Sequence, residues 1–306
     1  MLGLEIPSKS DTARAGEPNS LRELLREASG RLARAGVDAP ESAARLLAAA
    51  AIGCSAAELI TRRDCAIEPD VSRRMVEFVR RRAAREPVSR ILGSRGFFGR
   101  EFALSPATLD PRPDSEVLVE AVLAFLETKG WQSRPLRILD VGTGSGCLLL
   151  TLLAELPLAT GLGTDISLAA LEMAASNARQ LGVLERARFL VARSLEGVAG
   201  PFDILVCNPP YIASGDIPGL EPEVRDFDPL TALDGGADGL QVYRQILAAI
   251  EQVVPSGYAA LEVGAGQANA VEQMLRGALD PGRLGKRTRH LDLGGHIRCV
   301  SLEIQL

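Results

Sequence analysis

A strand-like apolar run ends in four residues whose types suit recognition of a planar nitrogen: Asn208, Pro209, Pro210 and Tyr211. The lone pair of an amide or of an exocyclic base amine is delocalised, so this nitrogen reacts well only when acceptors hold both of its N–H groups. The Asn208 side-chain oxygen is one acceptor, and the Pro209 carbonyl is a natural second. Consecutive prolines stiffen the turn, and the Tyr211 ring can lie against a flat group. We expect all four residues to bind substrate, with Asn208, Pro209 and Tyr211 catalytic.

A glycine-rich turn upstream of this segment predicts a cofactor site. The strand-like run 137–142 leads into alternating glycines, and an apolar helix follows at 146–156. Such a turn lets a ligand approach the backbone closely. The spacing is G-x-G-x-G, which is neither the dinucleotide pattern nor a phosphate loop, so it argues against NAD and ATP. The expected cofactor contacts in this turn are Gly142, Thr143, Gly144, Ser145 and Gly146.

Asp165 ends the next strand-like run, 159–165. An acid at the carboxyl end of the second strand can accept hydrogen bonds from both ribose hydroxyls. It could instead cap the helix that begins near Ser167. With the glycine turn and Asn208, which we expect beside the cofactor as well, Asp165 indicates S-adenosylmethionine. The combined features predict methyl transfer to an amide or exocyclic amine nitrogen.

Composition is that of a packed globular protein. Of its residues, 46% are hydrophobic and 24% are charged. The length of 306 residues leaves room for one large and one small domain. No uninterrupted apolar run reaches the length of a membrane span. The five cysteines are odd in number and lack metal-ligand spacing, so we expect no metal, reduced thiols and a cytoplasmic location.

The chain divides into four segments. We expect a flexible tail at 1–19, a helical bundle at 20–86, a hairpin-like linker at 87–113 and an α/β domain at 114–306. The bundle shows helical periodicity at 20–36, 40–53, 55–62 and 69–84. Its last helix carries an arginine-rich stretch that is either a solvated face or a contact for an acidic partner or RNA.

In the second domain strands alternate with helices, which predicts a parallel sheet covered on both faces. The expected strands are 137–142, 159–165, 187–192, 202–207 and 258–263, and an antiparallel pair at 284–292 and 297–305 closes one edge. The expected helices are 114–129, 146–156, 167–181, 238–252 and 266–279. In such α/β sheets ligands bind beyond the carboxyl ends of the strands. One crevice can therefore hold the cofactor and the target nitrogen together.

From about residue 20 onward the chain resembles the protein-(glutamine-N5) methyltransferases that modify peptide-chain release factors. Asn-Pro-Pro-Tyr alone is shared with DNA adenine and rRNA methyltransferases, so other segments carry the specificity. These segments are Arg85-Glu86-Pro87-Val88, Ile91-Leu92-Gly93, Phe97-Phe98-Gly99, Pro111-Arg112-Pro113-Asp114-Ser115-Glu116, Leu233-Asp234-Gly235-Gly236, Asp238-Gly239-Leu240 and Tyr243-Arg244.

The resemblance implies a seven-stranded Rossmann-like S-adenosylmethionine-dependent methyltransferase domain behind a small helical bundle. The implied substrate is the glutamine of the Gly-Gly-Gln loop in release factors, docked with help from the bundle. Phe97 and Arg112 are expected to shape the substrate mouth, and Ser194 to lie beside the cofactor. The chain departs from the family pattern at Ala192-Arg193-Ser194, because the acid that usually faces the adenine amino group is missing and arginine cannot accept a hydrogen bond.

Three other functions stay open on these observations. A ribosomal-protein glutamine could be the target, although Arg112-Pro113 favours release factors. Methylation of an RNA or DNA amine would require a more basic surface around the cleft. A binding module that lost catalysis would be consistent with Ala192-Arg193. We expect a monomer that binds release factors and contacts neither membrane nor nucleic acid directly.

Overall fold

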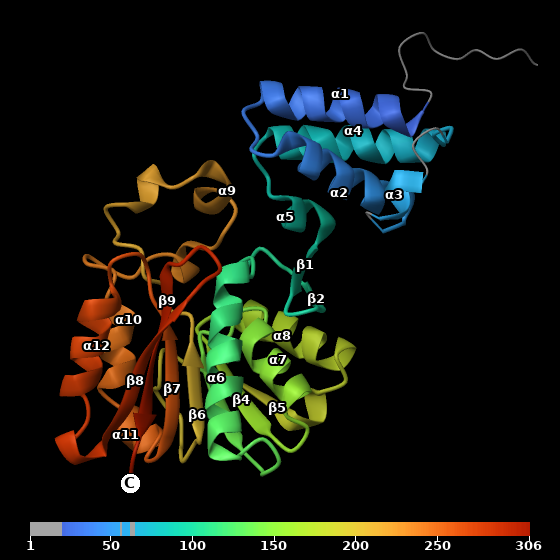
Figure 1. Ribbon diagram of the computed structural model, residues 1–306. Coiled ribbons are helices and arrows are strands. Elements are labelled where there is room, and N and C mark those ends of the chain that lie inside the picture. Colours follow the sequence, from blue (N-terminus) through green and yellow to red (C-terminus); the bar gives the residue numbers. More distant parts are fainter. Residues whose placement is uncertain (1–19, 56, 62–64) are drawn as a thin grey trace, which may run out of the picture. The chain divides into compact units, whose positions relative to one another are not determined.

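The computed structural model describes residues 20–55, 57–61 and 65–306. The expected tail at 1–19 and part of the expected helix at 55–62 lie outside these residues. The chain forms two compact units, one ending at Leu92 and the other running from Gly93 to Leu306 (Figure 1). Within the described residues, no helix is both long enough and apolar enough to cross a bilayer.

The first unit is helical. Its helices are α1 (Leu21–Arg34), α2 (Pro40–Ile52), α3 (Glu58–Thr61), α4 (Pro69–Ala83) and α5 (Val88–Leu92). Apolar residues of α1 recur at helical spacing and meet α2 and α4 in one core, which includes Leu32, Leu47 and Met75. Helix α5 was not expected, because Pro87 indicated an end. Pro87 instead starts a new turn, and its carbonyl accepts from the Ile91 N–H at 3.0 Å.

Several arginines of α4 form ion pairs within this unit. Arg80 bridges Glu77 at 2.6 Å, and Arg81 bridges Glu86 at 2.5 Å. Arg82 is buried rather than solvated. The arginine-rich stretch is therefore partly paired and partly buried within the unit.

The second unit opens with a hairpin, β1 (Ser94–Phe97) and β2 (Arg100–Ala103), within the expected linker. Its main sheet contains β3 (Arg137–Val141), β4 (Thr160–Asp165), β5 (Ala187–Val191), β6 (Ile204–Cys207), β7 (Gly257–Glu262), β8 (Leu284–Leu291) and β9 (Ile297–Ile304). The spatial order is β5-β4-β3-β6-β7-β9-β8. Strands β3 to β7 pair in parallel, whereas β9 runs antiparallel to both β7 and β8. The seven-stranded α/β fold and its antiparallel edge are therefore confirmed.

Helices cover both faces of this sheet. They are α6 (Glu116–Lys129), α7 (Cys147–Glu155), α8 (Leu168–Gln180), α10 (Gln241–Leu247), α11 (Ile250–Val253) and α12 (Ala268–Gly277). Helix α9 (Pro222–Arg225) lies in the long loop between β6 and α10, beyond the ends of the strands (Figure 1). Short 3-10 turns lie at Pro113–Ser115, Leu184–Arg186, Ile217–Gly219, Leu230–Ala232 and Pro281–Arg283. The expected helix at 238–252 is thus two helices, separated at Ala248 and Ala249. Both break residues are good helix formers, and nothing in the structure explains the break.

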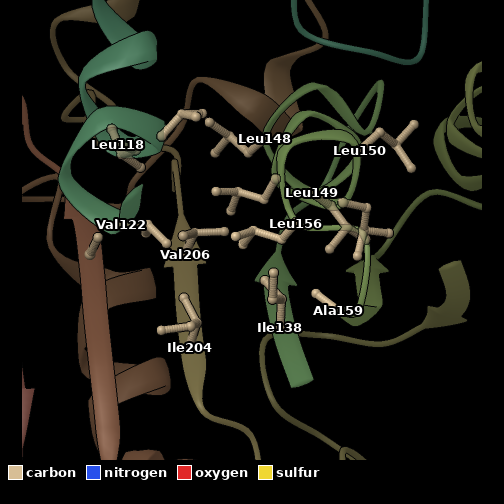
Figure 2. Close-up of a cluster of buried hydrophobic side chains, with 14 of the residues drawn as sticks. Leu118, Val122, Ile138, Leu148, Leu149, Leu150, Leu156, Ala159, Ile204 and Val206 are labelled. Atoms are coloured by element: carbon tan, nitrogen blue, oxygen red, sulfur yellow. The ribbon is translucent and has the colours of Figure 1, made fainter. Parts of the chain in front are cut away.

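Successive residues of each buried strand point to opposite faces. In β6, Ile204 and Val206 pack with α6, α7 and α8, while Leu205 and Cys207 pack with α10, α11 and α12. Figure 2 shows the first of these clusters, where α6 and α7 meet the sheet. The labelled residues are Leu118, Val122, Ile138, Leu148, Leu149, Leu150, Leu156, Ala159, Ile204 and Val206.

Leu149 gives a test of this core. Its side chain is 0% exposed and packs directly over the Gly161 backbone. Leu149→Ala is expected to lower the free energy of unfolding by about 2–5 kcal/mol, because it removes buried methyl groups and leaves a cavity. Leu168→Ala is the matched control, since Leu168 is 61% exposed on α8, and we expect a change within about 0.5 kcal/mol. Calorimetric melting of both variants measures the difference, and equal melting temperatures would contradict the packing.

Candidate active site

The glycine turn leaves the carboxyl end of β3 and stays close to β4. Gly142, Gly144 and Gly146 all have positive φ, at 72°, 55° and 81°, a region that glycine enters without strain. The Thr143 N–H donates to the Thr164 carbonyl at 2.8 Å. The turn therefore exposes backbone toward the space between β3 and β4.

The buried carboxyl group of Asp140 stabilises this turn through hydrogen bonds. Asp140 Oδ2 accepts from Thr143 Oγ1 at 2.7 Å and from the Leu149 N–H at 3.3 Å. Burial raises the pKa of Asp140 to about 7. Asp140 thus ties the end of β3 to the first turns of α7 and is not itself among the cavity residues.

Asp165 holds two backbone N–H groups beside the cavity, while Ser167 itself caps helix α8. Asp165 Oδ1 accepts from the Ser167 N–H at 2.9 Å, and its Oδ2 accepts from the Gly144 N–H at 3.0 Å. Burial raises the pKa of Asp165. Because an ionised carboxylate has about four lone-pair sites, each oxygen can still accept a hydroxyl from the cavity that Asp165 lines.

Ser194 lies across the same cavity with an unused hydroxyl. Its φ is +53°, a left-handed value uncommon for a residue other than glycine. Its Oγ is buried and has no hydrogen-bond partner in the described chain. Ala192 anchors the loop through a 3.0 Å bond from its N–H to the Asp165 carbonyl. The loop therefore carries a polar group that fits a ligand, although it lacks an acid.

These elements enclose a cavity of about 350 Å³. It brings together Gly142, Thr143, Gly144, Ser145, Asp165, Ser194, Asn208, Pro209 and Pro210 from the sequence-predicted set. Gly146 and Tyr211 are not among its lining residues, so Gly146 shapes the turn without facing the cavity. The cavity offers a carboxylate acceptor, hydroxyl groups and backbone N–H groups, together with the apolar side chains of Leu109, Val141 and Ile166. This lining suits a nucleoside-type cofactor such as S-adenosylmethionine.

The Asn-Pro-Pro-Tyr segment is held on several sides. Asn208 Nδ2 donates to Ser115 Oγ at 3.1 Å. The Tyr211 hydroxyl lies 3.4 Å from Glu262 Oε1, and Gln267 Nε2 donates to the Tyr211 carbonyl at 2.8 Å. Burial raises the pKa of Tyr211 above its usual value. The segment is thus a rigid corner, and its tyrosine stays neutral.

The Leu-Asp-Gly-Gly segment packs directly against this corner. The N–H of Gly235 donates to the Ile212 carbonyl at 2.8 Å, and the Ile212 N–H donates to the Leu233 carbonyl at 3.0 Å. A Cβ at Gly235 would lie 2.7 Å from the Pro210 carbonyl oxygen. Glycine is required because the two backbones approach so closely.

A second cavity, of about 230 Å³, adjoins the first and shares Asn208 with it. Its walls are mainly apolar: Leu109, Arg112, Asn208, Tyr211, Ile212, Leu220, Val224, Ala232 and Leu233. Asn208 and Arg112 line both cavities. Asn208 therefore borders both a cofactor-sized space and a space that Tyr211 also lines.

Arg112 lines both cavities, whereas Phe97 lines neither. Arg112 bridges Asp228 at 2.6 Å, which ties the loop before α6 to the loop after α9. Phe97 is fully buried, edge to face with Phe102 at 6.1 Å between ring centroids. The expectation that Phe97 shapes the mouth is wrong, because the period of two in β1 turns its ring into the core.

Sequence patterns missed three positioning groups. Ser115 and Glu262 support the corner, and Asn177 of α8 joins the hairpin to the glycine turn through bonds to Ala103 and Ser145. A charged residue at the end of the apolar run 257–262 was a signal for Glu262. Ser115 stands in the segment 111–116 that carries part of the family resemblance, whereas Asn177 has no comparable signal in the sequence.

Comparisons with known proteins agree with this site. The profile described as PrmC N-terminal domain matches residues 23–93, and the Methyltransferase small domain matches residues 113–218. Release factor glutamine methyltransferase of Rhodospirillum rubrum is 49% identical over 282 residues, which cover 92% of this chain and 84% of that protein. The protein of the same name from Bradyrhizobium diazoefficiens is 42% identical, with 95% and 98% covered.

A solved structure supports the fold independently. The catalytic domain of hMettl16, in complex with a MAT2A 3'UTR hairpin, has a TM-score of 0.53 and 14% identity, covering 80% of this chain and 84% of that one. At that identity the likeness concerns the fold alone. The two full-length bacterial relatives decide the family: the chain belongs to the release factor glutamine methyltransferases.

Proposed function

We propose that this protein transfers a methyl group from S-adenosylmethionine to the side-chain amide nitrogen of the glutamine in the Gly-Gly-Gln motif of peptide-chain release factors. Its membership of the release factor glutamine methyltransferase family supports the reaction and the methyl donor. One observation carries the assignment to a site: Asn208 lines both a cofactor-sized cavity and the neighbouring cavity bordered by Tyr211.

S-Adenosylmethionine supplies an electrophilic methyl carbon on a positively charged sulfur. For its binding we assign the glycine turn and Ser194 to the first cavity, together with the Asp165 carboxylate for the ribose hydroxyls. The orphaned Ser194 hydroxyl gives the loop after β5 a hydrogen-bonding group in place of the missing acid. The residues present therefore fit the donor.

We assign recognition of the target amide to the corner after β6. The side-chain oxygen of Asn208 and the carbonyl of Pro209 accept the two amide N–H groups, which holds the nitrogen in place and turns one face of the planar amide toward the first cavity. The Tyr211 ring borders the second cavity and supports the planar group. Once nitrogen gains the methyl group its proton becomes acidic and leaves to solvent, so a strong base is not required.

We assign release-factor docking to the helical unit, on the strength of its match to the PrmC N-terminal domain. We further propose that the enzyme acts as a cytoplasmic monomer without direct nucleic-acid contact.

The direct test is incubation of the purified enzyme with labelled S-adenosylmethionine and purified release factors, with the modified residue located by mass spectrometry. We expect one methyl group on the glutamine of Gly-Gly-Gln. Label on a ribosomal protein or on RNA, with none on the release factors, would overturn the proposed substrate.

Asp165→Ala tests the cofactor assignment. We expect the dissociation constant for S-adenosylmethionine to rise about tenfold or more, because a charge-assisted hydrogen bond is lost. Glu172→Ala is the matched control, since it removes the same charge from an exposed position on α8, and should bind normally. Calorimetry measures both, and equal affinity of the two variants would remove Asp165 from the site.

Asn208→Ala tests the target assignment. Methyl transfer should fall by about a hundredfold or more, because one acceptor for the amide is lost from a preorganised pair. The dissociation constant for the cofactor should stay nearly unchanged. Asn269→Ala, an exposed amide on α12, is the control. Single-turnover transfer by Asn208→Ala at the rate of this control would contradict the role of Asn208.

A further inference from the structure

A buried amide on α8 contacts two parts of the chain that lie far from it in sequence. Asn177 is only 1% exposed. Its Oδ1 accepts from the Ala103 N–H at 2.9 Å, and its Nδ2 donates to the Ala103 carbonyl at 3.1 Å and to the Ser145 carbonyl at 2.9 Å. The oxygen and both N–H groups of this side chain are therefore engaged within the protein.

The partners of Asn177 fix the orientation of its amide. Rotation of a carboxamide by half a turn exchanges its oxygen and its NH₂ group. In the rotated form the oxygen would face two carbonyls and the NH₂ group would face the Ala103 N–H, so all three bonds would be lost. Only one orientation of Asn177 is therefore compatible with its surroundings.

The two residues that Asn177 bonds belong to two segments of the cofactor cavity's wall. Ser145 is part of the glycine turn and lines the first cavity. Ala103 ends β2, and the segment 104–112 that follows it lines the same cavity. The lining residues of this segment are Ala107, Leu109, Pro111 and Arg112. One side chain therefore ties together two segments of wall that are distant in sequence.

Asn177 serves the end of β2 as a neighbouring strand would. Among the described residues β2 pairs with β1 alone, and bonding to both the N–H and the carbonyl of one residue is a pattern of strand pairing. The hairpin turn is held separately. The Phe98 N–H donates to Glu116 Oε1 at 2.7 Å, and Arg100 bridges Glu155 at 2.6 Å. Loss of the Asn177 amide would therefore release the end of β2 while the turn stays anchored.

We propose that Asn177 is a positioning residue that holds these two wall segments at a fixed spacing, and that it thereby makes cofactor binding and the order of the β1–β2 hairpin depend on each other. The inference rests on the proposed function, because the occupant of the first cavity is the methyl donor assigned there. Asn177 lines neither cavity, so it is assigned no contact with the donor or with the target.

The expected effect follows from preorganisation. A wall that is in place before the ligand arrives does not have to be ordered during binding. Without the amide of Asn177, segment 104–112 loses its link to the glycine turn, and buried backbone groups lose a partner. Binding of the donor must then restore the spacing, which weakens its affinity. Coupling of this kind is reciprocal, so a bound donor must also reduce opening of the hairpin in the wild-type protein.

Two variants separate positioning from chemistry. Asn177→Leu removes all three bonds at similar volume, and Asn177→Asp keeps an acceptor for Ala103 but places a carboxylate against two carbonyls. The dissociation constant for S-adenosylmethionine, measured by calorimetry, should rise about tenfold in each variant. With donor and release factor both saturating, kcat should change less than about twofold, because the filled cavity has its walls in place. Gln180→Leu, which removes an exposed amide from the same helix, should bind the donor normally.

Ser301→Ala controls for lost stability. It removes a buried polar group of the same unit at a position outside both cavities. Its melting temperature should fall while its dissociation constant for the donor stays at the wild-type value. An equal loss of affinity in Ser301→Ala would show that affinity follows stability alone, and it would overturn the inference.

Amide hydrogen exchange of the hairpin tests the coupling directly, because β1 and β2 line neither cavity. In the wild type, saturating S-adenosylmethionine should slow exchange of the Ala103 and Leu104 amides about threefold or more. In Asn177→Leu this slowing should be lost. Unchanged exchange at both amides in the wild type would overturn the inference even if the variants fail to fold, and so would wild-type affinity in both variants. A wild-type enzyme that binds the donor but leaves release factors unmethylated would instead overturn the proposed function.

Discussion

One row of paired residues across the parallel sheet positions the whole site. Val141 pairs with Thr164 on one side and with Cys207 on the other, and Cys207 pairs with Leu261. The next residues on these strands are Gly142, Asp165, Asn208 and Glu262, and the first three of them line the larger cavity. A slip of one residue in any strand would turn its side chains to the opposite face. The register is therefore the constraint that brings the glycine turn, Asp165 and the Asn-Pro-Pro-Tyr corner to one edge of the sheet.

Burial on both faces enforces that register. Strands β3, β6 and β7 have apolar side chains on both faces. Along each strand, residues therefore pack alternately against the helices on one face and the helices on the other. Shifting a strand would exchange two sets of closely packed side chains, which protein interiors tolerate poorly. Such a framework can hold reacting groups within the narrow distances that a weak amide nucleophile requires.

Rigidity at the corner comes from backbone contacts as much as from proline. The Gln267 side chain bonds the Tyr211 carbonyl, and the Gly235 backbone lies against Pro210. Arg112 and Asp228 fasten the adjacent loops. These contacts lie outside the cavities, and they hold in place the residues whose polar atoms face the cavities. Preorganisation of this kind lowers the cost of arranging donors and acceptors when substrate arrives.

The amino-acid sequence by itself determined the local features of this protein. Glycines at 142, 144 and 146, the two prolines after Asn208 and the alternation of strands with helices have consequences within a few residues, and they indicated the fold, the cofactor and the corner. Tertiary structure alone decided the rest. The bond between Ser115 and Asn208 spans 93 residues, the second cavity is built from four separate stretches, and Phe97 points into the core instead of the mouth. These features depend on how distant strands align and how side chains fill the space between layers, which no local pattern in the chain encodes.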